Sequence, residues 1–367
     1  MPQPSLPQLR RRLLAWYAHY HRQLPWRATP QSQISPRPSA VRNANPYHVL
    51  VSEAMLQQTQ VATVIPYFHR FIEQFPTVHD LAAAEEQQVL RLWQGLGYYR
   101  RARHLHAAAQ AIVQQHAGDV PETLDALLAL PGFGRYTAGA VASIAFGRRV
   151  PILDGNVARV LARVFNIDEP IDQPATRERL WQLADQVLPR KAVGDFNQAL
   201  MELGALICMP RRPQCAICPL EALCQARQSG RETTLPRRSP RKAPRAVHHV
   251  IAAIERQGRY LFEQRPARGL WSNMWQLPTH ETLGKDSAAA LLAWVRETYG
   301  LTCSPAPALA PFTHQTTHRT IRFTLQPLRV TAGRLRPGRG VWRKLDSLDD
   351  LPLPNPQHKA RALLRSG

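Results

Sequence analysis

Acidic residues are scarce in this chain of 367 residues. Asp and Glu number 26 against 47 Lys and Arg, so the formal net charge at pH 7 is +21. That excess is far larger than solubility requires, although solubility alone is the simpler alternative. A positive charge of this size is typical of proteins that bind a polyanion, most often nucleic acid.

Long apolar runs are also missing. The opening stretch, MPQPSLPQLRRRLLAWYAHYHR, holds no apolar core of signal-peptide length. Nowhere do about 18 uncharged apolar residues follow one another, as a membrane-spanning helix would need. We therefore expect a cytoplasmic protein with no membrane partner.

Cysteine is rare, with five residues in the chain, and a reducing compartment makes disulfides unexpected. Four of the five nevertheless fall within 17 residues, in a C-x6-C-x2-C-x5-C array formed by Cys208, Cys215, Cys218 and Cys224. Four thiolates at this spacing can hold one metal centre, either a zinc ion or an iron–sulfur cluster. The spacing alone leaves both open.

Residues 6 to about 225 show helical periodicity almost throughout. Apolar residues recur every three or four positions in stretches such as 61–75, 98–116, 157–165 and 196–207. Near the start, the face expected to be buried consists of Leu9, Leu13, Trp16 and Tyr20. A polar, proline-bearing stretch at 31–45 interrupts the pattern and predicts a mobile loop.

The composition changes after residue 225. Residues 226–246 lose apolar side chains and gain proline and basic residues, which is typical of an extended, solvated linker. Beyond it, 247–266 predicts two strands around a Gln257-Gly258 turn, 287–300 a helix and 318–330 a further strand. We therefore expect a helical domain at 1–225, a basic linker at 226–246 and an α+β domain at 247–367.

The stretch ALPGFGRYTAGAVASIAFG at 129–147 predicts two helices joined by a tight turn. Pro131 ends the first helix, and Gly132 and Gly134 permit backbone angles that other residues avoid. The second helix then starts with bare backbone N–H groups, where a phosphate can sit; an ordinary αα-corner is the alternative. A dinucleotide fingerprint is excluded because no strand precedes Gly132 and Thr137 occupies the third glycine position.

Together these motifs resemble a known family. LPGFGRYTAGA, followed by ILDGNVARVLAR and the cysteine array, is similar to the helix-hairpin-helix DNA glycosylases that include endonuclease III. VSEAMLQQTQV at 51–61, GLGYYRRARHL at 95–105 and the C-terminal domain narrow the resemblance to adenine DNA glycosylases of the MutY family. It implies a mainly α helix-hairpin-helix catalytic domain, with the hairpin at about 122–146 and a 4Fe-4S cluster in the loop 208–224. An α+β Nudix-like domain for 8-oxoguanine recognition would follow.

Enzymes of that family remove adenine mispaired with 8-oxoguanine or guanine, so the resemblance implies that duplex DNA carrying such a mispair is the partner. Cleaving an N-glycosidic bond requires a protonated leaving base and a stabilised cationic sugar, and so two acids with different tasks. By the resemblance, Glu53 protonates adenine at N7, with a pKa raised by apolar neighbours. Asp154 stays ionised beside the developing cation, and Asn156 orients it. The alternatives are a surface glutamate, a plain helix N-cap and a turn residue.

Tyr136 carries a separate implication. Bifunctional relatives have a nucleophilic lysine at this position and form a Schiff base with the sugar. A tyrosine cannot do so, and we therefore expect base excision without a lyase step, with Tyr136 shaping the pocket. A packed aromatic is the alternative.

The same correspondence assigns DNA contacts to further residues, each of which has a core or surface role as its alternative. Gln58 and Tyr98 would enter the duplex as wedges, and Thr59 and Leu96 would approach the oxidised guanine. The residues that would line the adenine pocket are Arg22, Trp26, Arg27, Leu56 and Gln198.

The C-terminal domain resembles a Nudix fold without its catalytic signature. Only Glu297 is kept, with Trp294 and Thr298 where other metal-binding glutamates belong, so no Mg²⁺-dependent hydrolase is expected. The loop FTHQTTH at 312–318 matches the family's 8-oxoguanine-sensing loop, in which a Phe-Ser-His element corresponds to Thr316, Thr317 and His318. The hydroxyl and the imidazole are kept, and the aromatic is missing.

Two other functions fit part of the sequence. A pyrimidine-excising or thymine-mismatch glycosylase would carry a lysine at position 136 or lack the C-terminal domain. A non-catalytic DNA-binding scaffold would keep all its properties in a Glu53→Gln variant. We expect the adenine glycosylase, acting as a monomer and associated with the nucleoid if the source is bacterial.

Overall fold

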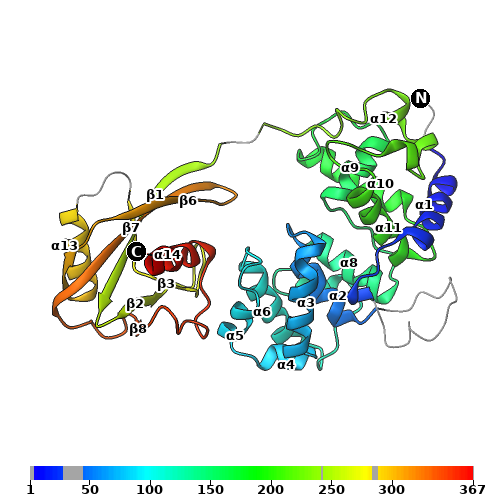
Figure 1. Ribbon diagram of the computed structural model, residues 1–367. Helices are drawn as coiled ribbons and strands as arrows, with labels where there is room; N and C mark the ends of the chain where they lie inside the picture. Colours follow the sequence, from blue (N-terminus) through cyan, green and yellow to red (C-terminus); the bar gives the residue numbers. More distant parts are fainter. Residues whose placement is uncertain (1–3, 28–43, 241–242, 283–287, 367) are drawn as a thin grey trace. The chain divides into compact units, whose positions relative to one another are not determined.

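The computed structural model describes residues 4–27, 44–240, 243–282 and 288–366. They form two compact units: unit 1 contains Met1–Ala83 and His104–Pro240, and unit 2 contains Ala84–Arg103 and Arg241–Gly367. Figure 1 shows helices in the first and a sheet with helices in the second. Residues 31–43 of the predicted loop at 31–45 lie outside the described residues.

Unit 1 is helical, as its periodicity predicts. Helix α11 packs against α1, α8 and α9, and α2 packs against α8. Its helices are α1 (Leu6–Tyr20), α2 (Pro46–Leu56), α3 (Val61–Gln74), α4 (Val78–Ala83), α6 (Arg100–Gln115, which begins in unit 2), α7 (Leu124–Ala129), α8 (Arg135–Phe146), α9 (Gly155–Val164), α10 (Pro174–Val187), α11 (Val193–Leu206) and α12 (Gln225–Gln228), with 3-10 turns η1 (Pro25–Arg27), η3 (Cys215–Ile217) and η4 (Glu221–Leu223).

The buried face of α1 differs from the expected one. Leu9, Leu13 and Tyr17 are buried, whereas Tyr20 is 68% exposed. The three buried residues are spaced by four positions, which keeps them on one stripe of the helix. Trp16 and Tyr20 instead stack on each other, with ring centroids 6.5 Å apart.

The predicted hairpin is formed by α7 and α8. Gly132 has a φ of +79°, and a Cβ there would lie 2.3 Å from Nδ1 of His104, so both the backbone angle and the space favour glycine. Helix α8 begins after Gly134 without a side-chain cap from the described residues. Its small side chains are buried from Thr137 to Ala145, which makes α8 a central helix of unit 1.

The stretch 226–246 is not solvated throughout, contrary to its composition. Ala226 in α12 is fully buried, and Leu235 is 1% exposed. The carbonyl of Leu235 accepts a hydrogen bond of 2.9 Å from Nε of Arg163, and the carbonyl of Arg237 accepts one of 3.0 Å from the amide of Ile171. The prediction of a solvated linker was wrong because single apolar residues and backbone hydrogen bonds attach this stretch to unit 1. Such contacts leave no apolar periodicity in the sequence.

Unit 2 contains a sheet of eight strands among the described residues, in the order β3-β2-β1-β7-β5, with β4, β6 and β8 pairing with β1, β7 and β2. The predicted turn at Gln257-Gly258 is confirmed, and both of its residues have a positive φ, as tight hairpins require. The elements are β1 (Arg245–Arg256), β2 (Arg259–Gln264), β3 (Trp275–Gln276), β4 (Thr279–Thr282), α13 (Ala288–Tyr299), β5 (Leu301–Pro305), β6 (Leu309–Gln315), β7 (Arg319–Gly333), β8 (Val341–Arg343) and α14 (Asn355–Ser366).

Both faces of this sheet are covered. Ile251 and Ala253 of β1 belong to one apolar cluster with Ala360 of α14, and Val250 and Ile254 belong to another with residues of α13. Strand β1 pairs in parallel with β7, and its apolar run is continuous because it is buried on both sides.

Residues 84–103 belong to unit 2 through polar contacts. Helix α5 (Glu86–Leu92) lies in this segment, and Oε1 of Glu86 accepts a hydrogen bond of 2.6 Å from Nδ2 of Asn273. Gln87 donates to the carbonyl of Asn273 at 2.9 Å, and Gln94 accepts from the amide of Leu353 at 3.1 Å. These contacts bring Tyr98 into the same unit as the loop 312–318.

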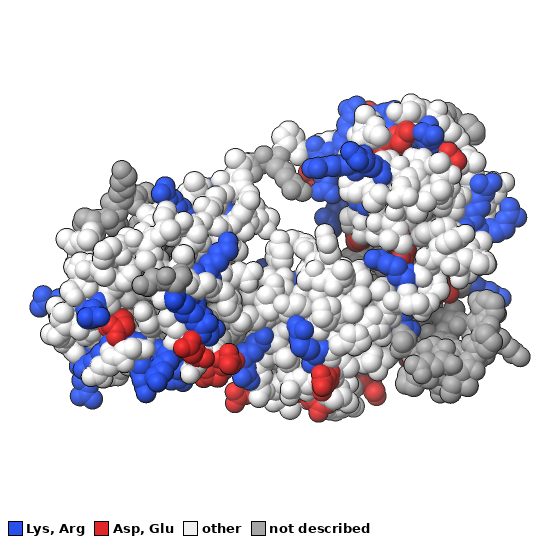
Figure 2. All heavy atoms as spheres, in the orientation of Figure 1, with Lys and Arg blue, Asp and Glu red and all other residues white. Residues whose placement is uncertain are grey.

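The surface agrees with the composition. On the face drawn in Figure 2, Lys and Arg side chains are more numerous than Asp and Glu. Among the described residues, no helix has the length and apolar character that crossing a bilayer requires.

Candidate active site

A cavity of about 680 Å³ in unit 1 collects the residues that the sequence singled out there. They come from η1, α2, α8, α11 and the start of α9, which are far apart in the chain. Helix packing therefore assembles the site. The predicted residues that line it are Arg22, Trp26, Arg27, Glu53, Leu56, Gln58, Thr59, Tyr136, Asp154, Asn156 and Gln198.

Glu53 is a buried carboxyl group on the wall of this cavity. It lies on α2, is 4% exposed, and has the fully buried Val51 and Met55 two residues to either side. Burial raises the pKa of Glu53 from 4.5 to about 7; the Tyr136 hydrogen bond opposes this rise and the charge of Asp154 adds to it. At neutral pH the group is therefore protonated in part and can act as an acid.

Tyr136 contacts this acid directly. The residue lies at the start of α8, and its hydroxyl donates a hydrogen bond of 2.8 Å to Oε2 of Glu53. The same hydroxyl lies 3.3 Å from Sδ of Met201 on α11. The Tyr136 hydroxyl therefore has two acceptors within reach, and the carboxyl group of Glu53 is the nearer of the two.

Asp154 caps α9 and faces the same cavity. Its Oδ1 accepts a hydrogen bond of 2.7 Å from the amide of Val157, and its Oδ2 accepts one of 2.9 Å from Nδ2 of Asn156. Burial raises the pKa of Asp154, and these two hydrogen bonds oppose the rise because they favour the anion. The N-cap, which was the alternative interpretation of Asp154, and the contact with Asn156 are both present.

Arg159 was missed by the sequence reasoning. It is 8% exposed, and its Nη2 donates hydrogen bonds of 2.8 Å to Oδ1 of Asn156 and to the carbonyl of Gly204. Its Nε donates at 2.7 Å to the carbonyl of Cys208. Gly204 lies so close that a Cβ there would be 2.6 Å from Cβ of Asn156. A continuous set of hydrogen bonds thus joins the backbone of Cys208 to the carboxylate of Asp154.

Glu202 was missed as well. It is 1% exposed on α11, and its carboxylate accepts two hydrogen bonds from Nε and one from Nη2 of Arg22, at 2.9 to 3.1 Å. Nη2 of Arg27 donates a fourth at 3.0 Å. The spacing of four residues from Gln198 is the signal that could have found it, because i and i+4 share a helix face. Glu202 fixes both arginines at the cavity.

The comparisons with known proteins agree with this geometry. The family profile described as "HhH-GPD superfamily base excision DNA repair protein" matches residues 51–186, and the one described as "NUDIX domain" matches 249–363. An adenine DNA glycosylase of Buchnera aphidicola (Baizongia pistaciae strain) is 32% identical over 355 residues, which are 95% of this chain and 94% of that protein. The chain belongs to the adenine DNA glycosylase family.

Two further similarities show how much of a relative this chain spans and which fold its helical domain has. The human adenine DNA glycosylase is 39% identical over 73% of this chain, and the match spans 56% of the human protein. A solved thermostable thymine-DNA glycosylase is 27% identical, with a TM-score of 0.52, and the match covers 61% of this chain and 97% of that one. The expected fold class is confirmed: a helix-hairpin-helix glycosylase domain followed by a Nudix-like domain.

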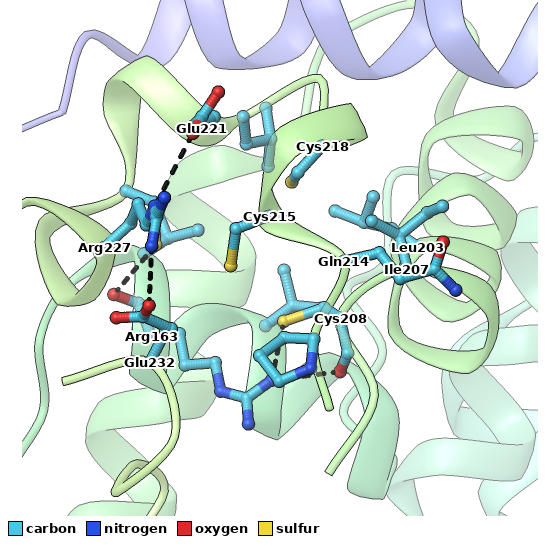
Figure 3. A pocket seen from close by; sticks show the side chains of 15 residues that line it. Arg163, Leu203, Ile207, Cys208, Gln214, Cys215, Cys218, Glu221, Arg227 and Glu232 are labelled. Carbon is cyan, nitrogen blue, oxygen red and sulfur yellow. Dashed lines mark hydrogen bonds and ion pairs between the residues drawn. The ribbon is translucent and has the colours of Figure 1, made fainter. Parts of the chain in front are cut away.

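The four cysteines of this family member line one small pocket with Val160, Arg163 and Leu220. Figure 3 shows the sulfur atoms of Cys208, Cys215 and Cys218 turned toward a common space. Arg163 is 1% exposed and donates a hydrogen bond of 3.2 Å to Sγ of Cys208 and one of 2.8 Å to the carbonyl of Met209. In the described part of the chain, no three Cys, His, Asp or Glu side chains are arranged to hold a single metal ion.

A second cavity, of about 450 Å³, lies in unit 2. The loop residues Thr316, Thr317 and His318 line it together with Tyr98 and Trp271. Trp271 has a φ of +55°, which is rare for a bulky residue, and its ring lies 5.6 Å from that of His314. An aromatic group, which the loop lacks at position 316, is thus present at this cavity from Trp271, a residue that sequence reasoning missed.

The remaining predicted residues are placed differently. Gly132 and Gly134 form the hairpin turn and line neither of these two cavities. Leu96 is 7% exposed and belongs to unit 2, whereas Thr59 belongs to unit 1. The two predicted wedges, Gln58 and Tyr98, are both exposed and have positive φ angles of 59° and 50°. Such strained backbone is common at functional sites.

Proposed function

We propose that this chain hydrolyses the N-glycosidic bond of adenine in duplex DNA. The observation that carries the proposal is the buried Glu53 carboxyl group, with a pKa of about 7, in one cavity with the capped carboxylate of Asp154. The proton of Glu53 goes to N7 of adenine, and the electron pair of the C1′–N9 bond leaves with the base. Asp154 stabilises the positive charge that develops on the sugar. Water then adds to C1′ and gives its proton to the carboxylate of Glu53.

The excision is proposed to be monofunctional. Tyr136 occupies the position of the lysine that forms a Schiff base in bifunctional relatives, and its hydroxyl is engaged with Glu53. A phenol cannot condense with the sugar aldehyde, so strand cleavage is not expected.

The substrate is proposed to be adenine opposite 8-oxoguanine or guanine, bound by a monomer. Support comes from the cavity of unit 2, where Trp271 offers an aromatic surface and Thr317 and His318 offer polar groups. A purine base can be recognised by contact with an aromatic side chain and by hydrogen bonds to its edge. Trp271 would supply the stacking that Thr316 cannot.

The cysteine pocket is proposed to bind a 4Fe-4S cluster. The donor set fits, because four cysteines line one pocket, and Cys thiolates are the ligands that such clusters take. Burial raises the pKa of Cys218 to about 12 and that of Cys224 to about 11, as is typical of thiols enclosed in protein. The cluster would hold the loop 208–224, whose Cys208 carbonyl binds Arg159.

The test is a single-turnover assay with duplexes that carry adenine opposite each of the four bases and opposite 8-oxoguanine, and one duplex that carries thymine opposite guanine. Free bases are measured by chromatography, and strand breaks are measured without alkali. Glu53→Gln is expected to abolish adenine release, whereas Glu169→Gln, which changes an exposed glutamate, is expected to leave it unchanged.

Three outcomes would contradict the proposal. Unchanged adenine release by Glu53→Gln would remove Glu53 from the chemistry. Release of thymine from its mispair with guanine, and not of adenine, would make the chain a pyrimidine glycosylase. Nicks without alkali, together with a borohydride-trapped adduct, would show a lyase step. Iron content and the visible spectrum test the cluster, and one zinc without iron would contradict it.

A further inference from the structure

A second cavity of unit 1 continues from the catalytic one. Its volume is about 450 Å³, and it shares with the catalytic cavity a wall formed by Leu56, Gln58, Tyr136, Asp154 and Gly155. The rest of its lining includes residues that none of the sequence motifs contains, among them Asp172, Arg177 and Arg238. We call this second cavity the lateral groove.

Arg238 reaches the lateral groove because the backbone on either side of it is attached to unit 1. The carbonyl of Arg237 accepts a hydrogen bond of 3.0 Å from the amide of Ile171, and the amide of Ser239 donates one of 2.9 Å to Oδ1 of Asp172. Leu235 is buried three residues earlier. This stretch is the one whose composition suggested a solvated linker, and it instead forms part of a groove wall.

The charges in the lateral groove are unevenly paired. Within the described part of the chain, the guanidinium groups of Arg177 and Arg238 have neither a hydrogen bond nor an ion pair, and both residues are exposed. Arg237, by contrast, forms an ion pair of 3.0 Å with Asp168. The acidic groups of the groove accept hydrogen bonds from other groups: Asp172 from Ser239, and Asp154 from Val157 and Asn156. The hydrogen bond from Ser239 lowers the pKa of Asp172, and the charge of Arg238 contributes to that shift without a direct ion pair. Two arginines are thus available to an anion.

The position of the lateral groove identifies that anion, given the proposed function. If Asp154 stabilises the sugar of the flipped nucleotide, that sugar lies where the two cavities share a wall. The phosphates on either side of a nucleotide are covalently attached to its sugar, so one of them must lie close to this wall. The catalytic cavity contains Trp26, Glu53 and Gln198 for the base. The lateral groove is the neighbouring space with unpaired cations.

We propose that the lateral groove binds a backbone phosphate next to the flipped nucleotide, and that Arg238 and Arg177 bind it. This inference rests on the proposed function for its geometry and adds a DNA contact from the stretch 226–246. Arginine binds phosphate oxygens through two parallel N–H groups, and such contacts fix the register of the protein on the duplex.

The test compares two neighbouring arginines. Arg238→Ala and Arg237→Ala remove the same charge one residue apart, but only Arg238 lines the groove. The DNA probe is a duplex that carries 2′-fluoro-2′-deoxyadenosine opposite 8-oxoguanine. The glycosidic bond of this adenosine analogue resists cleavage. Its affinity is measured by fluorescence anisotropy between about 50 and about 300 mM salt. The logarithm of the binding constant falls linearly with the logarithm of the salt concentration, and each lost phosphate contact makes this slope less steep by about 0.9.

We expect this reduction for Arg238→Ala and for Arg177→Ala, about twice the reduction in the double variant, and a slope close to that of the parent for Arg237→Ala. Arg238→Lys should restore most of the slope because it keeps the charge. Equal slopes for Arg238→Ala and Arg237→Ala, or an Arg238→Ala slope equal to that of the parent, would overturn the inference. Melting temperatures of all variants show whether each remains folded.

The two proposals can fail separately. If the parent protein releases no adenine from a cleavable duplex, the proposed function fails, while the slopes still report whether Arg238 binds a phosphate. If the parent releases adenine and the slopes do not change, only the inference about the lateral groove fails.

Discussion

The hydroxyl of Tyr136 lies 2.8 Å from Oε2 of Glu53 and donates its proton to it. This hydrogen bond and the burial of Glu53 shift its pKa in opposite directions. Burial raises the pKa of Glu53 to about 7, and the hydrogen bond lowers it because it favours the carboxylate. Tyr136, which we propose to stand in place of a lyase nucleophile, therefore also adjusts the pKa of Glu53.

Tyr136→Phe is expected to shift the fall in excision rate at high pH to a higher pH. Only the protonated form of Glu53 can protonate adenine, so a pKa of about 7 makes the parental rate fall about tenfold between pH 6 and pH 8. Without the hydrogen bond the pKa rises, and the fall over this interval becomes smaller. Single-turnover rates across pH test this prediction. An equal or steeper fall in the variant would contradict it.

Glu202→Gln is expected to shift the same fall in excision rate to a lower pH. The charge of Arg27 lowers the pKa of Glu53, and Glu202 compensates that charge through a contact of 3.0 Å. Without the carboxylate the arginine acts unopposed, the pKa of Glu53 falls, and less acid is protonated at pH 7. The same assay should show a several-fold lower rate at pH 7 and a smaller loss at pH 5. A fall in rate that occurs at higher pH in the variant than in the parent would refute this account.

Glu53→Gln is expected to stabilise the protein at alkaline pH. The pKa of Glu53 is about 7 in the folded protein against an ordinary 4.5, so the folded state binds the extra proton and loses stability as pH rises from about 4.5 to about 7. Glutamine does not ionise and avoids this loss. The gain in unfolding free energy should be about 2 to 3 kcal/mol larger at pH 8 than at pH 5, by chemical denaturation. A gain independent of pH would exclude a buried, ionising Glu53.

Arg159→Met is expected to slow excision roughly 100-fold while the protein still binds DNA. Arg159 holds Asn156, which in turn donates to Asp154, so its loss releases the carboxylate from its orientation. Arg179→Met, an exposed change, is the matched control. Iron content is measured in the same preparations, because Arg159 also binds the carbonyl of Cys208. A rate within about threefold of the parent would show that Asn156 does not need this support.

Trp271→Ala is expected to reduce the preference for 8-oxoguanine over guanine about tenfold, since base–aromatic stacking contributes about 1 to 3 kcal/mol per base. Thr316→Phe, which supplies an aromatic group from the loop itself, should recover part of that preference in the Trp271→Ala background. The ratio of single-turnover rates for the two mispairs is the measurement. An unchanged ratio in both variants would separate this cavity from base recognition.

The candidate residues that could be proposed from sequence are those that occur in a local pattern. Glu53 and Asp154 occur within short motifs, and the four cysteines indicate a common pocket because the chain between them is short. The hairpin could be predicted for the same reason, because proline and glycine act on the backbone within two or three residues.

The residues that were missed depend on partners distant in the chain. Glu202 binds Arg22 and Arg27, which precede it by 180 and 175 residues, and no periodicity reports such a pairing. The composition around Arg238 predicts a solvated linker, because it does not reveal the backbone groups that attach this stretch to unit 1. Trp271 lies 45 residues before Thr316, the loop position that lacks the aromatic, and only the folding of unit 2 brings them to one cavity.

The contact of Gly204 with Asn156 has a consequence for inherited variation. A single methyl group at position 204 would overlap the side chain of Asn156 and displace the turn that presents Asp154. A missense change from glycine to alanine, which most substitution tables score as mild, would therefore act here as a loss of function.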